Sequence, residues 1–450
     1  MGVRVMAYRL TLEGDGRRHL IYDPATSSLV EQDGDGAQIA HPAFATDGPV
    51  SWSVPRRVSP GNPGRKKDVR TLKIQMGFRC NYACAYCNQS SHSHFLGGAT
   101  EDARRFLDTL DTWFRPGGGE DVRIEFWGGE PFVYWARLRL LGEALRGKFP
   151  DAHLNVITNG SLLDDEKADW LIENRVGVQI SHDGPAQKHR HPEDILDDPE
   201  KRRVIRKLVR AGIAGFGTVL TRWNFSLAAA RRHIEEKLEL PPGTISHNTE
   251  EILLPFDAAA LDCVPQGEAE HRAALHTLFR EAANGESVPA CNSARRKIED
   301  FFASLGQRRP LAALGQKCGM DREDAIAVNL MGEVTTCHNT AADGRHRIGT
   351  VADLDGVRLT TAHHHQTRSE CRCCPVVQLC KGSCMFLEGA YWQAACDVSF
   401  IYNTAMLAAS LYYLTGLTLT RIEALDGGFI RRPGRTAAEV IRLAPGGAPS

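Results

Sequence analysis

Three cysteines lie close together in the stretch IQMGFRCNYACAYCNQ, where Cys80, Cys84 and Cys87 are separated by three and then two residues. Three thiolates cannot complete a structural zinc site alone, because such a site takes four protein ligands. They can hold three irons of a [4Fe–4S] cube, whose usual ligand count is four cysteines. The fourth iron would then be open to an outside ligand. The alternative is a loop of buried or redox-active cysteines without a metal.

A second group of cysteines occupies the C-terminal third of the chain. Only one pair, Cys371 and Cys374, has the two-residue spacing of a zinc knuckle, and a zinc ribbon needs two such pairs. Seven cysteines are also too many for one zinc ion. The group consists of Cys318, Cys337, Cys371, Cys374, Cys380, Cys384 and Cys396.

The composition supports metal binding over disulfide bonding. The chain has 450 residues, 13 cysteines and a net charge of −1, with 42% hydrophobic and 24% charged residues. The first 14 residues lack the apolar core and cleavage site of a signal peptide. We therefore expect a cytoplasmic protein, in which clustered cysteines bind metal more often than they form disulfides. The near-zero charge gives no argument for nucleic acid or a membrane surface as partner.

Strand and helix patterns alternate from about residue 70 to residue 255. This alternation is typical of parallel strands joined by crossover helices. Six repeats favour a partial (β/α)6 barrel, in which chemistry takes place at the C-terminal ends of the strands. The expected strands are Leu72–Gly77, Val122–Trp127, His153–Thr158, Val176–Ser181, Gly215–Leu220 and Glu251–Leu254. The expected helices are Glu101–Phe114, Phe132–Phe149, Asp164–Asn174, Pro199–Ala211 and Ser226–Leu238.

Polar and glycine residues follow several of these strands. The second strand ends in Gly128-Gly129-Glu130-Pro131, the third in Asn159, and the fourth in Ser181-His182-Asp183. Glycines let the backbone approach a ligand closely, and a carboxylate accepts hydrogen bonds from an ammonium group. Each stretch alone is also an ordinary turn, so its position at a strand end carries the argument.

The cysteine spacing, the aromatic Tyr86 before the last cysteine, and the strand-end residues together resemble the radical S-adenosylmethionine (SAM) superfamily. The resemblance implies that the open iron chelates the methionine part of SAM and that an electron from the cluster cleaves SAM to a 5′-deoxyadenosyl radical. It also implies cofactor-binding roles for certain residues. These are Tyr86 at the adenine, Gly128, Gly129 and Glu130 at the α-amino group, Ser181 and Asp183 at the ribose or carboxylate, and Asn159 in the pocket wall.

The C-terminal cysteines resemble a SPASM domain, which carries two auxiliary [4Fe–4S] clusters. The wiring of that family would give Cys318, Cys337 and Cys384 to the first cluster. It would give Cys371, Cys374, Cys380 and Cys396 to the second. The fourth ligand of the first cluster is not identified: Cys263 or Cys291 could supply it, or one iron is open. Cys373 is extra to the pattern.

These resemblances imply an enzyme that abstracts hydrogen from a ribosomally made precursor peptide and forms an oxidative crosslink. We favour a carbon–carbon (cyclophane) bond over a thioether. His338 stands where sulfatase-maturing relatives have a catalytic Asp, which argues against sulfatase maturation but leaves a group able to take a proton. The expected cofactors are three [4Fe–4S] clusters and SAM, and the expected electron donor is a flavodoxin or ferredoxin. The alternatives are a small-molecule radical SAM dehydrogenase and a non-catalytic Fe–S electron-transfer protein.

The remaining segments complete the expected domain organisation. Residues 1–57 read as a small N-terminal β region, 58–69 as a linker, 70–265 as the barrel and 266–315 as bridging helices. Residues 316–425 form the auxiliary-cluster region, and 426–450 read as a mobile tail. Val398–Thr420 carries no charge and is long enough to cross a membrane. Its polar residues and the cysteines before it favour a buried helix, with Asp397 or Ser399 as a potential cap.

Overall fold

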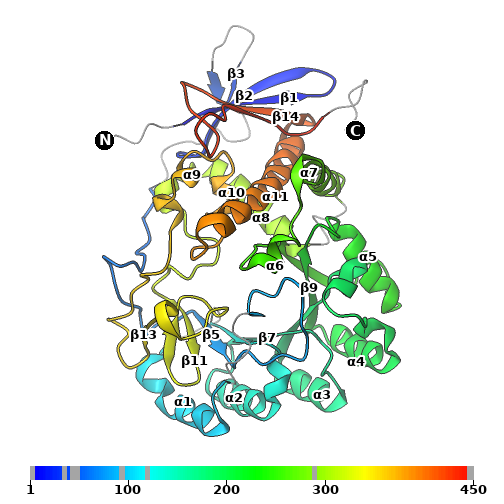
Figure 1. The fold of residues 1–450 in the computed structure, drawn as a ribbon, viewed down its shortest axis with the longest axis vertical. Helices are drawn as coiled ribbons and strands as arrows, with labels where there is room; N and C mark the ends of the chain where they lie inside the picture. The colour runs from blue at the N-terminus through cyan, green and yellow to red at the C-terminus, as the bar shows by residue number, and fades with distance from the viewer. Residues whose placement is uncertain are drawn as a thin grey trace.

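The computed structural model describes residues 6–32, 38–40, 51–90, 97–116, 122–285 and 291–442. These residues form two β-sheets at opposite ends of the molecule, with a long helix between them (Figure 1). A six-stranded sheet lies near the two termini, and a nine-stranded sheet forms the larger body at the other end.

Six strands of the larger sheet run parallel in chain order, which confirms the predicted α/β barrel class. They are β5 Thr71–Gln75, β6 Arg123–Trp127, β7 His153–Thr158, β8 Val176–Ser181, β9 Ala214–Leu220 and β10 Ser246–Ile252. The helices between them are α1 Thr100–Trp113, α2 Trp135–Lys148, α3 Asp165–Glu173, α4 Pro199–Arg210 and α5 Leu227–Lys237.

Three of these helices begin where a polar side chain accepts a hydrogen bond from the first turn. Asp164, Asp198 and Ser226 are the N-caps of α3, α4 and α5. The sixth strand was predicted at Glu251–Leu254, but β10 begins five residues earlier in the chain, at Ser246. Its residues SHNTEEI lack an apolar alternation, and its place is set by pairing with β9.

The barrel sheet continues past β5 into the cysteine-rich region. Strand β11 Ala325–Asn329 pairs in parallel with β5, from Thr71 opposite Ala325 to Gln75 opposite Asn329. The antiparallel strands β12 Glu333–Thr335 and β13 Arg347–Thr350 follow. None of these three strands was predicted from the sequence. Strands of three to five residues are too short to show a clear period in sequence.

The smaller sheet joins both ends of the chain. It has the antiparallel order β15, β14, β1, β2, β3, β4. The predicted N-terminal strands are present, but two C-terminal strands complete their sheet. The bounds are β1 Tyr8–Glu13, β2 Arg17–Asp23, β3 Ser28–Gln32, β4 Gln38–Ala40, β14 Thr418–Ala424 and β15 Ala437–Glu439.

Two segments predicted to be loose are packed against the rest of the protein. In the predicted linker, the amides of Gly64 and Arg65 donate to the carbonyls of Val357 and Leu354, and Arg65 is buried. The predicted mobile tail is described as far as residue 442, where Ile430 is buried and β15 pairs with β14. Its Gly, Pro and Arg content concealed these contacts, which depend on the tertiary structure.

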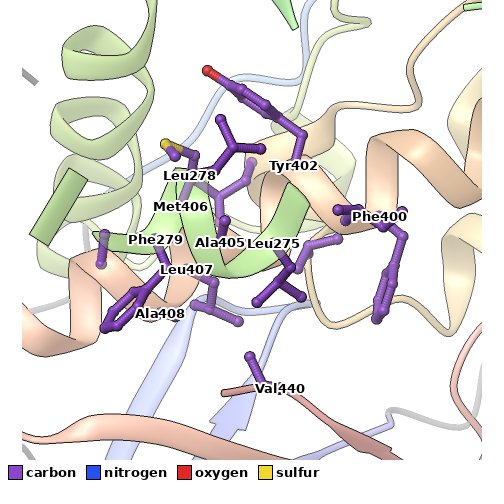
Figure 2. Close-up of a cluster of buried hydrophobic side chains, with 14 of the residues drawn as sticks. Leu275, Leu278, Phe279, Phe400, Tyr402, Ala405, Met406, Leu407, Ala408 and Val440 are labelled. Carbon is purple, nitrogen blue, oxygen red and sulfur yellow. The ribbon is translucent and has the colours of Figure 1, made fainter. Parts of the chain in front are cut away.

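Helix α11, Gly389–Thr415, connects the two ends of the molecule. It packs on α7 Gly267–Ala283 and α8 Asn292–Gly306, and Figure 2 shows Leu275, Leu278 and Phe279 of α7 among its apolar side chains. Its most apolar 18-residue window is 83% buried, so the predicted buried helix is confirmed. The helix begins before the expected Val398 and ends before the expected Thr420, because Gly416 adopts a left-handed conformation (φ 71°).

The two expected caps of that helix were wrong because both residues lie inside it. Asp397 pairs with Arg431, and the Ser399 hydroxyl donates to the Ser383 hydroxyl at 2.9 Å. Short helices complete the described fold: α6 Ala258–Leu261, α9 Ser369–Arg372 and α10 Val377–Cys380.

The packing of α11 predicts a large stability loss on truncation of its core. Leu407 is fully buried on this helix. We expect Leu407→Ala to destabilise the protein by about 2–5 kcal/mol, through lost apolar burial and a residual cavity. Urea unfolding followed by circular dichroism measures the change. Gln393→Ala, at an exposed position of the same helix, is the matched control and should change stability little. Equal effects of the two substitutions would contradict this packing.

Candidate functional site

A cavity of about 950 Å³ lies between the C-terminal ends of the barrel strands and the cysteine-rich region. Both sides of the cavity carry cysteines. The barrel contributes the loop after β5, and the other side contributes residues near β12 and α10. The six cysteines that line the cavity are Cys80, Cys84, Cys87, Cys318, Cys337 and Cys384.

The loop that carries Cys80 is held by the turn after β6. The amides of Gly129 and Glu130 donate to the carbonyls of Gly77 and Arg79, at 2.9 and 3.0 Å. A Cβ atom on Gly129 would lie 2.5 Å from the Arg79 carbonyl oxygen, which no side chain can tolerate. The glycines of this turn thus allow close contact between the turn and the cysteine loop, and Gly128 and Gly129 both line the cavity.

The cavity cysteines are free thiols, and their buried surroundings disfavour the ionised thiolate. All 13 cysteines are unpaired. Burial raises the pKa of Cys80 to about 11, of Cys337 to about 12 and of Cys384 to about 11. A thiolate is the form that binds a metal, so a cationic group must supply the missing stabilisation and release the protons. The donor set fits iron–sulfur chemistry on this ground.

The spacing of the sulfurs disfavours a single zinc ion. In the described residues, no three cysteines bring their sulfur atoms within 4.8 Å of one another. The sulfurs around one tetrahedral zinc lie about 3.8 Å apart, given a Zn–S bond of about 2.3 Å. A cube of four irons holds each thiolate on a different iron and therefore spreads the thiolates more widely. The described arrangement therefore does not contain a preformed three-cysteine zinc site.

Glu130 is fully buried behind the cavity wall and is already engaged with the protein. Its carboxylate accepts hydrogen bonds from the Thr158 hydroxyl and the amides of Asn159 and Phe132, at 2.7, 2.7 and 3.1 Å. Burial raises its pKa to about 7, against the effect of these hydrogen bonds. The side chain thereby fixes Asn159, which lines the cavity and donates to Asn81 at 2.9 Å. Glu130 itself is not among the residues that line the cavity.

Asp183 also acts behind the wall, in contrast to the expected cofactor contact. It is buried, and its carboxylate accepts from the Tyr86 hydroxyl, the Val219 amide and the Arg190 guanidinium. Tyr86 and Ser181 do line the cavity, as does Arg190, which sequence reasoning missed. Burial would lower the pKa of Arg190, but Asp183 and the Cys84 thiol more than offset this and raise it. Arg190 is thus a fixed cation beside the cysteine loop.

His182, between Ser181 and Asp183, belongs to a separate hydrogen-bonded group. Its Nδ1 accepts from the Gly184 amide at 3.0 Å, so its Nε2 carries the proton and donates to Asp194 at 2.9 Å. His233 also approaches Asp194, at 3.4 Å. A metal at this triad would need the Nε2 lone pair, which the tautomer inferred from the hydrogen bonds does not offer. The three side chains instead tie the β8 end to α5.

Four cysteines surround a second, smaller pocket next to α11. Cys371, Cys374, Cys380 and Cys396 line it together with Arg431, which comes from the C-terminal segment. Burial raises the pKa of all four thiols, with facing cysteines adding to the effect at several of them. The structure therefore separates the C-terminal cysteines into the groups of three and four that the resemblance implied. That they bind iron stays a prediction.

The other cysteines face neither site. Cys263 and Cys373 are buried and donate to the carbonyls of Ala259 and Ser369, at 3.3 and 2.9 Å. Cys291 is buried beside the Ser293 hydroxyl at 3.3 Å. None of the three lines the cavity or the smaller pocket. Neither Cys263 nor Cys291 is therefore placed to complete the group of Cys318, Cys337 and Cys384.

His338, the expected proton acceptor, lies in the cavity wall against an aromatic ring. Its imidazole lies 3.8 Å from the Trp127 ring centre, and the Gln75 amide donates to its carbonyl at 2.8 Å. Burial, and then the nearby Lys73 ammonium, lower the pKa of His338 well below its usual range. An imidazole with so low a pKa is a weak base at neutral pH. Lys73 and Trp127 also line the cavity and were missed from the sequence.

Comparison with known proteins identifies the barrel. Residues 74–226 match the family model described as Radical SAM superfamily. The radical SAM cyclopropyl synthase TigE of Paramaledivibacter caminithermalis is 23% identical over 144 residues. That alignment covers 29% of this chain and 30% of TigE, so the likeness concerns under a third of either protein.

The fold extends the likeness to most of the chain. The structure of native anSMEcpe with bound AdoMet and Kp18Cys peptide has a TM-score of 0.51 and 18% sequence identity. The match covers 77% of this chain and 99% of that one. The form of anSMEcpe with AdoMet alone has the same TM-score and covers 76% of this chain. At these identities the likeness establishes a shared fold.

The position of Glu130 predicts the effect of a conservative substitution. Glu130→Gln keeps the shape of the side chain and removes the charge. If the carboxylate also attracts the SAM ammonium, binding should weaken by about 1.5–3 kcal/mol, roughly 10- to 150-fold, as for a charge-assisted hydrogen bond. Anaerobic equilibrium dialysis with labelled SAM measures this. Glu143→Gln, on the surface of the same barrel, is the control. Unchanged SAM affinity at normal iron content would leave Glu130 with a purely structural role.

Proposed function

We propose, from the premise that this chain is a radical SAM enzyme, that it matures a ribosomally made peptide by an oxidative crosslink. One observation carries the proposal: the same cavity has the Cys80–Cys84–Cys87 loop on one side and Cys318, Cys337 and Cys384 on the other. A substrate in this cavity would lie between two redox-active walls. One solved relative supports the substrate class, because anSMEcpe was solved with a bound peptide.

The residues of the cavity would hold the cofactors. Cys80, Cys84 and Cys87 would hold one [4Fe–4S] cluster and leave one iron for SAM, which when bound supplies a 5′-deoxyadenosyl radical. Tyr86, fixed by Asp183, would pack against the adenine. Gly128 and Gly129 would receive the amino group, with Asn159 and Ser181 beside them, and the Glu130 carboxylate would act on that group from behind the cavity wall. An external donor such as a flavodoxin or ferredoxin would supply the electron.

Apolar side chains in the cavity wall favour an apolar substrate side chain. Leu253, Leu254, Phe256, Met385 and Phe386 line the cavity. The rings of Phe256 and Phe386 lie 5.4 Å apart. An aromatic or aliphatic side chain would bury its surface against these residues. This supports carbon–carbon cyclophane formation over a thioether, because the latter would bring a cysteine thiol to the same wall.

The C-terminal cysteines would remove the electron that an oxidative crosslink leaves on the substrate. Cys318, Cys337 and Cys384 would hold the first auxiliary cluster at the cavity. No fourth cysteine lines the cavity on this side, which supports an open iron as the remaining coordination position. Cys371, Cys374, Cys380 and Cys396 would hold the second cluster. His338 lines the cavity next to Cys337, and we leave proton removal unassigned.

The test is mass spectrometry of candidate precursor peptides co-expressed with the enzyme under anaerobic conditions. A crosslink that releases two hydrogen atoms lowers the peptide mass by about 2 Da, and fragmentation locates the bond. A peptide modified by wild type and unmodified with a Cys84→Ala enzyme would support the proposal. Turnover of a small molecule, with every neighbouring short peptide left unmodified, would support the dehydrogenase alternative instead.

Metal content is the first prediction from this assignment. Three cubes give about twelve irons per chain. Replacing Cys80, Cys84 and Cys87 together with Ala should lower this to about eight irons, because the auxiliary sites share no ligand with the barrel loop. Iron and sulfide analysis after anaerobic reconstitution measures both values. A fully reconstituted wild type with only four irons would contradict the assignment.

The second prediction separates electron transfer from a structural role of the second auxiliary cluster. Cys374→Ala removes one ligand of this cluster and leaves the barrel loop intact. We expect 5′-deoxyadenosine still to form, while crosslinked peptide falls by a much larger factor. Side-by-side quantification of the two products, with circular dichroism on the same sample, makes the comparison.

A purely structural cluster gives a different outcome. Both products would then fall together with loss of the folded spectrum, since a site whose metal supplies folding energy collapses without it. Crosslinking at the wild-type rate would exclude both roles for this cluster.

A further inference from the structure

The C-terminal segment 426–442 places a side chain in the wall of the four-cysteine pocket. Its backbone is held at two points: the Arg431 amide donates to the Cys373 carbonyl at 2.7 Å, and β15 pairs with β14 in the small sheet. Ile430 is fully buried at the same place. Because this segment runs from the small sheet to the four-cysteine pocket, one of its side chains can lie against the cysteines.

That side chain is Arg431. It is 2% exposed and lines the pocket with Cys371, Cys374, Cys380 and Cys396. Its guanidinium lies 4.7 Å from the Phe400 ring centre, and its Nη2 donates to Asp397. Its Nε is buried and has no hydrogen-bond partner in the part of the chain that the structure describes. An N–H group in such a position costs free energy unless a ligand accepts its hydrogen bond.

The backbone conformation of Arg431 indicates that surrounding contacts hold this residue in place. Arg431 has a φ of +62°, a left-handed conformation that L-residues other than glycine adopt at a cost. The surrounding contacts, to the Cys373 carbonyl and the Asp397 carboxylate, hold it there. With the placement fixed in this way, the buried Nε–H, which lacks a partner among the described residues, points to an acceptor at the four cysteines.

We propose that Arg431 donates its Nε–H to a sulfur of the second auxiliary cluster and raises the reduction potential of that cluster. The inference rests on the proposed function, because it takes the four cysteines as cluster ligands. A hydrogen bond to sulfur and a nearby positive charge both stabilise the reduced, more negative form of an iron–sulfur cluster. The C-terminal segment thereby makes the second cluster a better electron acceptor than it would be without Arg431.

The test is an anaerobic redox titration of the reconstituted full chain, followed by electron paramagnetic resonance. The signal of the second cluster is the one that Cys374→Ala abolishes. Arg431→Met removes both the charge and the N–H donor at similar length. We expect its midpoint potential to shift to more negative values by at least about 59 mV, equivalent to tenfold in the equilibrium constant of a one-electron couple. Arg431→Lys keeps the charge and should shift less.

The chain offers a matched control in Arg432. Its side chain is 45% exposed, and it donates to the same Asp397 carboxylate at 3.1 and 3.2 Å. It does not line the cysteine pocket. Arg432→Met removes the same charge from the same segment, so it should leave the potential unchanged. An equal shift in both variants would overturn the proposal, because it would reflect the charge of the segment and no contact with the cluster.

Other outcomes also decide between the possibilities. An unchanged potential in Arg431→Met at full iron content would overturn the proposal while leaving the proposed function intact. If Arg431→Met does not retain the cluster, Arg431→Lys takes its place, and an unchanged potential there would overturn the proposal. A wild-type protein without any signal that depends on Cys374 would overturn the cluster assignment itself, and with it this inference.

Discussion

The parallel pairing of β5 with β11 brings the two halves of the cavity together. Five consecutive residue pairs, Thr71 with Ala325 to Gln75 with Asn329, fix the register. Strand β12 then turns back antiparallel to β11, and the segment after it, with Cys337 and His338, lies beside the end of β5. Side chains then connect the loops: Gln75 donates to the carbonyls of His338 and Thr340, and Gln89 donates to Asn339 at 2.8 Å. A shift in this register would separate the two cysteine groups.

The second constraint is electrostatic. The cysteine sites lie where burial opposes thiolate formation, so each needs cationic charge to hold the ionised ligands. The iron atoms would supply most of this charge. The protein adds fixed cations at two of the sites: Arg190, held by Asp183, beside the barrel loop, and Arg431, held by Asp397, beside the four-cysteine pocket. Both arginines are held by a carboxylate, which keeps the cation in place next to the sulfurs.

The barrel and the cysteine groups could be predicted from the sequence because their patterns are local or periodic. Cys80, Cys84 and Cys87 share one short loop, and the alternation of strands and helices has a regular spacing. Residues whose roles depend on tertiary contacts could not be predicted from the sequence. Nothing near Arg190 or Arg431 in the chain marks them as neighbours of a cysteine site. Asp183 was expected to touch the cofactor, but its carboxylate supports Tyr86 from behind. The strands β11 to β13 were missed because they are too short to show a period.

The account depends on the barrel loop being the place where SAM is cleaved. The most direct measurement is 5′-deoxyadenosine release from SAM by dithionite-reduced protein under anaerobic conditions, with wild type and Cys84→Ala compared at equal concentration. The auxiliary cysteines are intact in both. The account predicts 5′-deoxyadenosine from wild type and none above background from Cys84→Ala. Equal release by the two proteins would contradict it, because SAM cleavage would then take place at a site other than the Cys80–Cys84–Cys87 loop.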